Sequence, residues 1–74
     1  MPSDKTIDLR RRGCPDPIID ALRIIDKAKK GDIIIFLVDK GECTDLLLEL
    51  LSTLDVERIA TRSEDDYVRV IVRV

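Results

Sequence analysis

Residues 32–38, with the sequence DIIIFLV, decide the fold of this 74-residue chain. The six apolar residues from Ile33 to Val38 are the longest apolar run, and a membrane span needs about 20. A short apolar run bounded by polar residues is typical of a buried strand in a parallel arrangement. We therefore expect a central strand over Asp32–Val38 and a turn over residues 39–42.

The segment before this strand has the period of a helix. Between Pro15 and Lys30, the residues Ile18, Leu22 and Ile25 recur on one helix face. Acidic residues stand in its first turns and lysines in its last, as the helix dipole favours. Gly31 is expected to end it.

The pattern changes again after the central strand. A stripe of leucines over Asp45–Leu54 predicts a second helix, with Cys43 or Thr44 as its cap. Alternating residues over Val56–Arg62 and Tyr67–Val74 predict two strands joined by a polar turn.

With a short strand at Lys5–Leu9, the predicted order is β-α-β-α-β-β. Crossovers of the usual hand that step the same way put both helices on one sheet face. We expect a single domain over residues 1–74 of the α/β (α+β) class: a two-layer sandwich with a four-stranded mixed sheet. The other sheet face should present Thr6, Asp8, Tyr67, Arg69 and Arg73 to solvent. Outward residues of the central strand are then either partly covered by arginine stems or part of a docking surface.

Composition limits the possible functions. Hydrophobic residues make up 45%, which argues against disorder, and 13 Lys+Arg against 15 Asp+Glu give a net charge of −2. A net charge this small produces no electrostatic field around the whole molecule that would attract nucleic acid or an anionic membrane. The absence of His and the presence of only two Cys exclude His-based catalysis and a four-Cys zinc site, so we expect no metal and no cofactor. No signal-peptide pattern opens the chain, so a cytoplasmic location is expected. The absence of Asn and Gln and the many balanced charges predict a thermophilic source.

One motif carries chemistry, Cys14-Pro15-Asp16-Pro17, between a strand and a helix. With Cys14 as N-cap and the prolines at the first and third helical positions, the amides of Asp16 and Ile18 are nearest the sulfur. The helix dipole and the upstream arginines then favour a thiolate or a persulfide anion. The alternative is a cysteine that is simply a small buried hydrophobe beside a rigid helix start.

At these residues the chain resembles the TusA/SirA family of small sulfur carriers, over Lys5–Val74. The likeness rests on Cys-Pro-x-Pro, on Asp8 six residues before the cysteine, and on the element order. It implies a fold similar to the C-terminal domain of translation initiation factor three. It also implies that Cys14 carries a persulfide, with Pro15 and Pro17 shaping the helix entrance. A cysteine desulfurase or rhodanese-like protein would donate the sulfur, for tRNA thiolation, molybdenum cofactor synthesis or sulfur oxidation.

The chain departs from the family at two places. Arg11 stands where the family usually has Gly, three residues before the cysteine, and Asp39-Lys40-Gly41 replaces a common Asp-Asp-Pro. Both lie where a partner would dock, so the resemblance does not identify the partner.

The leading hypothesis is therefore a sulfurtransferase of the carrier type, with protein donor and acceptor as partners and no membrane. Arg10, Arg11 and Arg12 would steer an acidic partner toward Cys14, and the chain would be a monomer or a weak dimer. The alternative is a nucleic-acid or protein-binding module on the same fold, supported by these arginines and Tyr67. Net charge and the scarcity of aromatic residues argue against direct nucleic-acid binding.

The second cysteine, Cys43, has two interpretations. Neighbouring parallel strands would bring it to the same sheet edge as Cys14, although each loop can displace its sulfur sideways. It is either a helix-cap or packing residue, or a resolving cysteine that releases sulfide and closes a disulfide.

Overall fold

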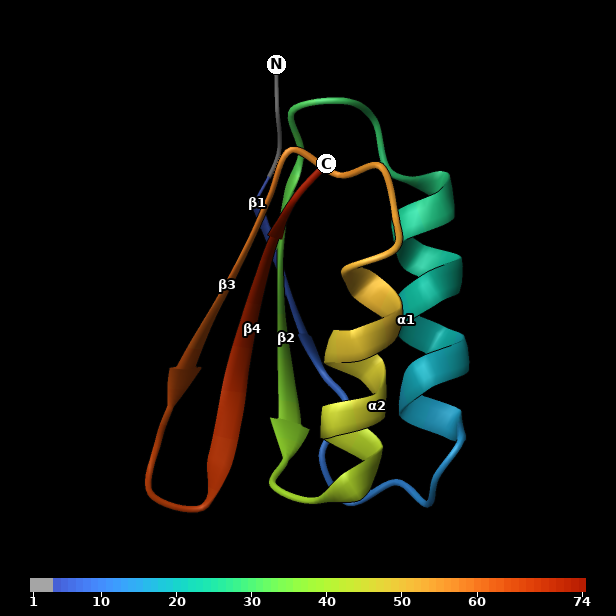
Figure 1. The fold of residues 1–74 in the computed structure, drawn as a ribbon. Coiled ribbons are helices and arrows are strands. Elements are labelled where there is room, and N and C mark those ends of the chain that lie inside the picture. The colour runs from blue at the N-terminus through green and yellow to red at the C-terminus, as the bar shows by residue number, and fades with distance from the viewer. Residues whose placement is uncertain (1–3) are drawn as a thin grey trace.

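Four strands and two helices follow one another as β-α-β-α-β-β in the computed structural model, which describes residues 4–74 (Figure 1). The elements are β1 (Asp4–Asp8), α1 (Asp16–Lys27), β2 (Ile33–Asp39), α2 (Glu42–Leu51), β3 (Arg58–Ser63) and β4 (Tyr67–Arg73). The predicted order and fold class are confirmed.

The sheet is mixed and has the strand order β1-β2-β4-β3. β1 pairs with β2 in parallel, with Ile7 opposite Phe36, whereas β4 runs antiparallel to both β2 and β3. β2 therefore lies inside the sheet between β1 and β4. Its inward side chains Ile34, Phe36 and Val38 are buried and the residues between them are half-buried, which explains its nearly continuous apolar sequence.

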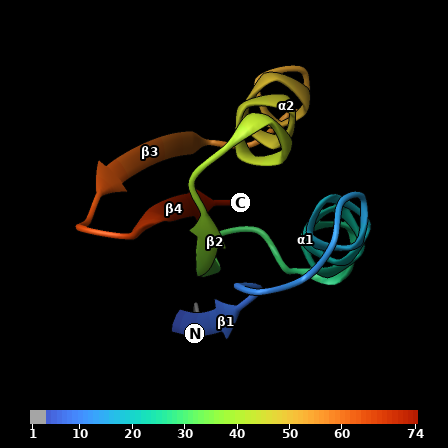
Figure 2. The ribbon, with the colours of Figure 1, turned by 90° about the horizontal axis from the view of Figure 1, so that it is seen from below.

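Both helices cover the same face of the sheet (Figure 2). α1 buries Ile18 and Ile25 there, and α2 buries Leu47 and Leu51. These residues pack with the inward side chains of β2 and β4 into one core. Leu46 was expected on the buried stripe of the second helix, but 45% of it is exposed. Neither helix within residues 4–74 is long and apolar enough to cross a membrane.

α1 ends three residues earlier than predicted, at Lys27 rather than Lys30. The amide of Lys29 donates to a carboxylate oxygen of Asp32, and the amide of Gly31 donates to the carbonyl of Val74. The second of these contacts joins distant parts of the chain. The chain therefore leaves the helix before Gly31, because these amides have acceptors outside it.

α2 begins at Glu42 rather than at the predicted Asp45. Its N-cap is Gly41, whose φ of 146° is a conformation that residues with a Cβ rarely adopt. Neither predicted cap, Cys43 or Thr44, is the cap. Thr44 is buried inside the first turn, and its hydroxyl donates to the carbonyl of Asp39.

The uncovered face of the sheet is mostly as predicted. Thr6, Asp8 and Arg73 are exposed, whereas Tyr67 and Arg69 are half-buried. Arg69 reaches the Tyr67 hydroxyl at 3.3 Å, and that hydrogen bond is the main cause that raises the pKa of its guanidinium. The aromatic ring therefore lies against the sheet beside its arginine neighbours.

Candidate functional site

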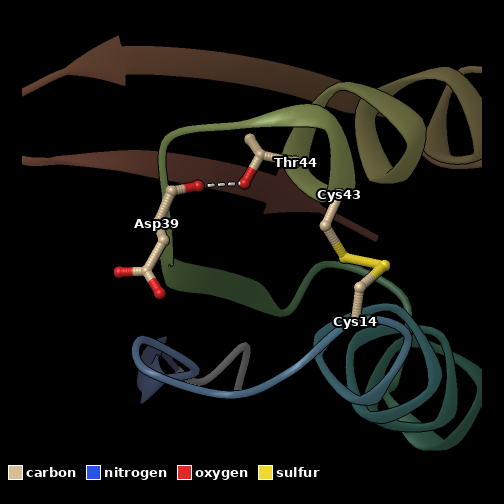
Figure 3. Close-up of a disulfide and its surroundings, with 4 residues drawn as sticks. All are labelled: Cys14, Asp39, Cys43 and Thr44. Carbon is tan, nitrogen blue, oxygen red and sulfur yellow. Dashed lines mark hydrogen bonds between the residues drawn. A yellow bond between two sulfur atoms is a disulfide. The ribbon is translucent and has the colours of Figure 1, made fainter.

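Cys14 and Cys43 are joined in a disulfide at the end of the molecule where both helices begin (Figure 3). Their Cα atoms are 5.9 Å apart, although 29 residues separate the two cysteines in sequence. The structure thus brings together the two residues that the sequence offers for sulfur chemistry.

The topology accounts for this meeting. β1 and β2 are parallel neighbours, so the loops that follow them leave the same edge of the sheet. α1 and α2 then both start at that edge and run back along the sheet (Figure 1). Because α2 starts as early as Glu42, Cys43 lies in its first turn. The Cα separation falls within the range that a disulfide spans.

The helix entrance differs in detail from the prediction. Pro15, not Cys14, is the N-cap of α1, so Asp16 and Pro17 are its first two residues. The amide of Asp16 donates to the carbonyl of Gly13 at 2.9 Å, and that of Ile18 to the carbonyl of Pro15 at 3.0 Å. This turn moves the cysteine one residue out of the helix and satisfies both amides that were expected to lie nearest the sulfur. The Cys14–Pro15 peptide bond is cis.

The two cysteines differ in exposure. Cys14 is exposed, whereas Cys43 is half-buried and packs against the core. A hollow of about 60 Å³ lies beside Cys43, with Pro17, Leu47 and Arg12 among its lining residues. Pockets that bind small molecules have volumes of about 300–1,000 Å³, so this hollow is too small for a metabolite.

The three arginines before Cys14 have different environments. Arg10 pairs with Asp8 at 3.0 Å and lies over the Tyr67 ring, 4.9 Å from its centroid. Arg12 pairs with Asp20, which lies in the second turn of α1. Within residues 4–74, the guanidinium of Arg11 forms no ion pair. The predicted cationic patch therefore has its least neutralised charge at Arg11.

Two aspartates at the strand ends hold the loop that carries Cys14. Asp8 accepts hydrogen bonds from both the backbone and the side chain of Arg10, and the side-chain bond is the main reason that the pKa of Asp8 is lowered from 3.8 to about 2. Asp39 accepts the amide of Arg11 at 2.7 Å. Arg11 itself has a φ of 65°, in the left-handed region that favours glycine.

Sequence reasoning missed this role of Asp39. The resemblance did contain a signal for the left-handed backbone of Arg11, because the family usually has a glycine at that position. A left-handed backbone at that position explains such a glycine physically.

The chain is similar to known proteins in its fold and in its sequence. The fold matches the crystal structure of a SirA-like protein from Desulfitobacterium hafniense with a TM-score of 0.76, over 92% of this chain and 93% of that one. At 21% sequence identity this match shows the fold alone. No curated protein matches the chain. The family described as sulfurtransferase TusA matches residues 5–74, including both cysteines and the Cys-Pro-x-Pro segment. The chain therefore belongs to the TusA sulfurtransferase family, which confirms the resemblance and implies a sulfur-carrier or sulfurtransferase role.

Proposed function

We propose that the protein carries sulfane sulfur as a persulfide on Cys14 and relays it between a protein donor and a protein acceptor. The observation that carries the proposal is the position of Cys14 in a chain matched to the family over residues 5–74. Cys14 is exposed, in the connection between β1 and α1. A docked partner can reach a sulfur there without opening the core.

The transfer needs only one thiolate from this chain. In the reduced protein the Cys14 thiolate attacks the outer sulfur of a donor persulfide, which forms Cys14–S–SH and releases the donor thiolate. Attack by an acceptor nucleophile on the outer sulfur completes the relay and regenerates the Cys14 thiolate. Because the thiol must be free, the disulfide with Cys43 has to be reduced before loading.

The partner proposed for this end of the molecule has an acidic surface. Arg10 and Arg12 are held by carboxylates of this chain, so Arg11 is the one of these three arginines that no carboxylate within residues 4–74 neutralises. Arg11→Ala should slow loading at low salt more than at high salt, because steering by exposed charges is screened by ions. Equal loading rates for the variant and the native chain at every ionic strength would exclude this role.

The identity of the donor and acceptor, the location and the source organism's growth temperature also belong to the proposal. The donor would be a cysteine desulfurase or a rhodanese-like protein, and the acceptor would serve tRNA thiolation, molybdenum cofactor synthesis or sulfur oxidation in the cytoplasm. A thermophilic source is proposed from the absence of Asn and Gln. Unfolding of the disulfide form near 50 °C would contradict that source.

The alternative, a nucleic-acid-binding module, gains no support from the uncovered sheet face. Arg62 and Arg69 share the carboxylate of Glu64, and Arg73 pairs with Glu57, whereas Arg58 on the same face forms no ion pair within residues 4–74. The paired arginines release few counterions on meeting a phosphate backbone, and the face offers only one aromatic ring, Tyr67, for stacking on a base. We therefore retain sulfur carriage as the single proposed function.

Intact mass spectrometry tests the proposal. The reduced, desalted protein is incubated with a cysteine desulfurase and cysteine, without added thiol. The Cys43→Ser chain should gain the mass of one sulfur atom, and Cys14→Ser should gain none. Absence of any adduct on Cys43→Ser with desulfurase and rhodanese donors alike would overturn the proposal, provided that its circular dichroism matches the native chain.

A further inference from the structure

We propose that Cys43 is a resolving cysteine that gives this carrier a second activity, the release of its bound sulfur as sulfide. This inference rests on the proposed persulfide at Cys14. Release as sulfide is a different fate for the bound sulfur from transfer to an acceptor. The protein would then act as a single-turnover persulfide reductase whenever no acceptor is docked.

The observed disulfide identifies the sulfur atom that Cys43 reaches. Its bond runs from Cys43 Sγ to Cys14 Sγ, and Cys14 Sγ is the inner sulfur of Cys14–S–SH. Attack by Cys43 on that atom yields the disulfide present in the structure. With the Cα atoms 5.9 Å apart, both helix starts already have the separation that this product needs.

The surroundings of Cys43 suit a nucleophile. It lies in the first turn of α2, where the backbone amides have no acceptor within the helix and the dipole is positive. The acidic residues Glu42 and Asp45 in the same turn act against the dipole, so the position of Cys43 beside Cys14 carries the inference. Its half-buried position against the core, together with the bond from Thr44 to the Asp39 carbonyl, fixes the start of α2 opposite Cys14.

The step balances without an outside oxidant. The Cys43 thiolate attacks Cys14 Sγ, the Cys14–S–S–Cys43 bond forms, the bond to the outer sulfur breaks, and HS⁻ leaves with the electron pair. The two cysteines are oxidised to a disulfide and the sulfane sulfur is reduced to sulfide. Hydrogen sulfide is a stronger acid than an ordinary cysteine thiol, so HS⁻ leaves more readily than a cysteine thiolate would. A dithiol reductant then restores both thiols.

The location of Cys14 allows the two fates to compete. Cys14 is exposed on the side that a partner would approach, whereas Cys43 attacks from the α2 side. A docked acceptor takes the outer sulfur, and Cys43 attacks the inner one. Sulfide release should therefore fall when an acceptor is present.

A single-turnover experiment tests the inference. Reduced and desalted native chain, Cys43→Ser and Cys43→Ala are loaded anaerobically by a desulfurase with limiting cysteine, without any small-molecule thiol. Free sulfide is trapped with a bimane reagent, and intact masses are followed under non-reducing conditions. The native chain should release about one sulfide per protein and lose the mass of two hydrogens relative to the dithiol form. Both variants should hold the added sulfur, with release at least about tenfold slower, because the attacking thiol is no longer held in place.

The outcomes separate this inference from the proposed function. The resolving role alone would be overturned if Cys43→Ser loads and the native chain also holds a stable persulfide. In that case Cys43 of the native chain can still be alkylated. A persulfide found on Cys43 would also overturn it, because that product requires attack on the outer sulfur. Failure of both variants to load, while they remain folded by circular dichroism, would instead overturn the persulfide on Cys14.

Discussion

Arg11 shows how one residue combines a backbone requirement with a charge. Its φ of 65° is unfavourable for a residue with a Cβ, by about 1 kcal/mol. Arg11→Gly should therefore raise the free energy of unfolding by about 1 kcal/mol, although glycine also gains entropy in the unfolded chain. Arg11→Ala is the matched control, because it removes the same charge and keeps the Cβ. Equal stability of the two variants in urea unfolding would mean that the backbone at this position carries no such cost.

Asp8 gives the site its expected response to acid. Its pKa is lowered from 3.8 to about 2, mainly by the hydrogen bond from the side chain of Arg10. Because the folded pKa is the lower one, this interaction stabilises the fold above about pH 4 and is lost as the pH falls through 2.

NMR titration of the Asp8 carboxyl carbon measures this pKa directly. The midpoint should lie near 2 in the native chain and return toward 3.8 in Arg10→Ala. A midpoint near 3.8 in the native chain would show that the pair with Arg10 does not persist in solution.

For the helices and strands, the sequence predicts their type and order better than the residues at which they begin and end. Period and alternation located α1, β2 and β4, because burial on one or both faces determines those patterns. The C-terminal end of α1 depends on a contact between Gly31 and Val74, two residues that are too far apart in the sequence for a local pattern to reveal it. Proximity of Cys14 and Cys43 could be anticipated from the parallel strands. The disulfide itself depends on the early start of α2.

That early start depends on Gly41. Its φ of 146° is accessible essentially to glycine alone, and a Cβ there would meet no atom within 4 Å, so a substitution tests backbone strain without a clash. Gly41→Ala should lower the free energy of unfolding by about 1–3 kcal/mol. Since Cys43 lies two residues on, disulfide closure should also slow.

Gly13→Ala is the control for this variant. Its Cβ also meets nothing within 4 Å, and its φ lies outside the left-handed range. Its stability should change by less than about 1 kcal/mol. A loss of stability as large as that of Gly41→Ala would show that the effect is not specific to the start of α2.

At the scale of the whole molecule, the disulfide links redox state to stability. It closes a loop of 29 residues, and restriction of the unfolded chain by such a loop contributes about 3 kcal/mol. The oxidised chain should therefore melt roughly 10 °C or more above the reduced chain, since 1 kcal/mol shifts Tm by about 4–8 °C in a domain of this size. Calorimetry with and without reductant measures the difference, and Cys43→Ser should match the reduced protein. Identical melting temperatures for all three would show that the bond does not restrict the unfolded chain.

The central claim is that Cys14 holds the sulfur, and peptide mapping tests it most directly. After loading by a desulfurase, the Cys43→Ser and native chains are alkylated and cut with trypsin, which places Cys14 in the peptide 13–23 and residue 43 in the peptide 41–58. We predict an alkylated persulfide on 13–23 of Cys43→Ser, and on the same peptide of the native chain at the earliest times. A persulfide on 41–58 of the native chain, with none on 13–23 of either protein, would contradict the account.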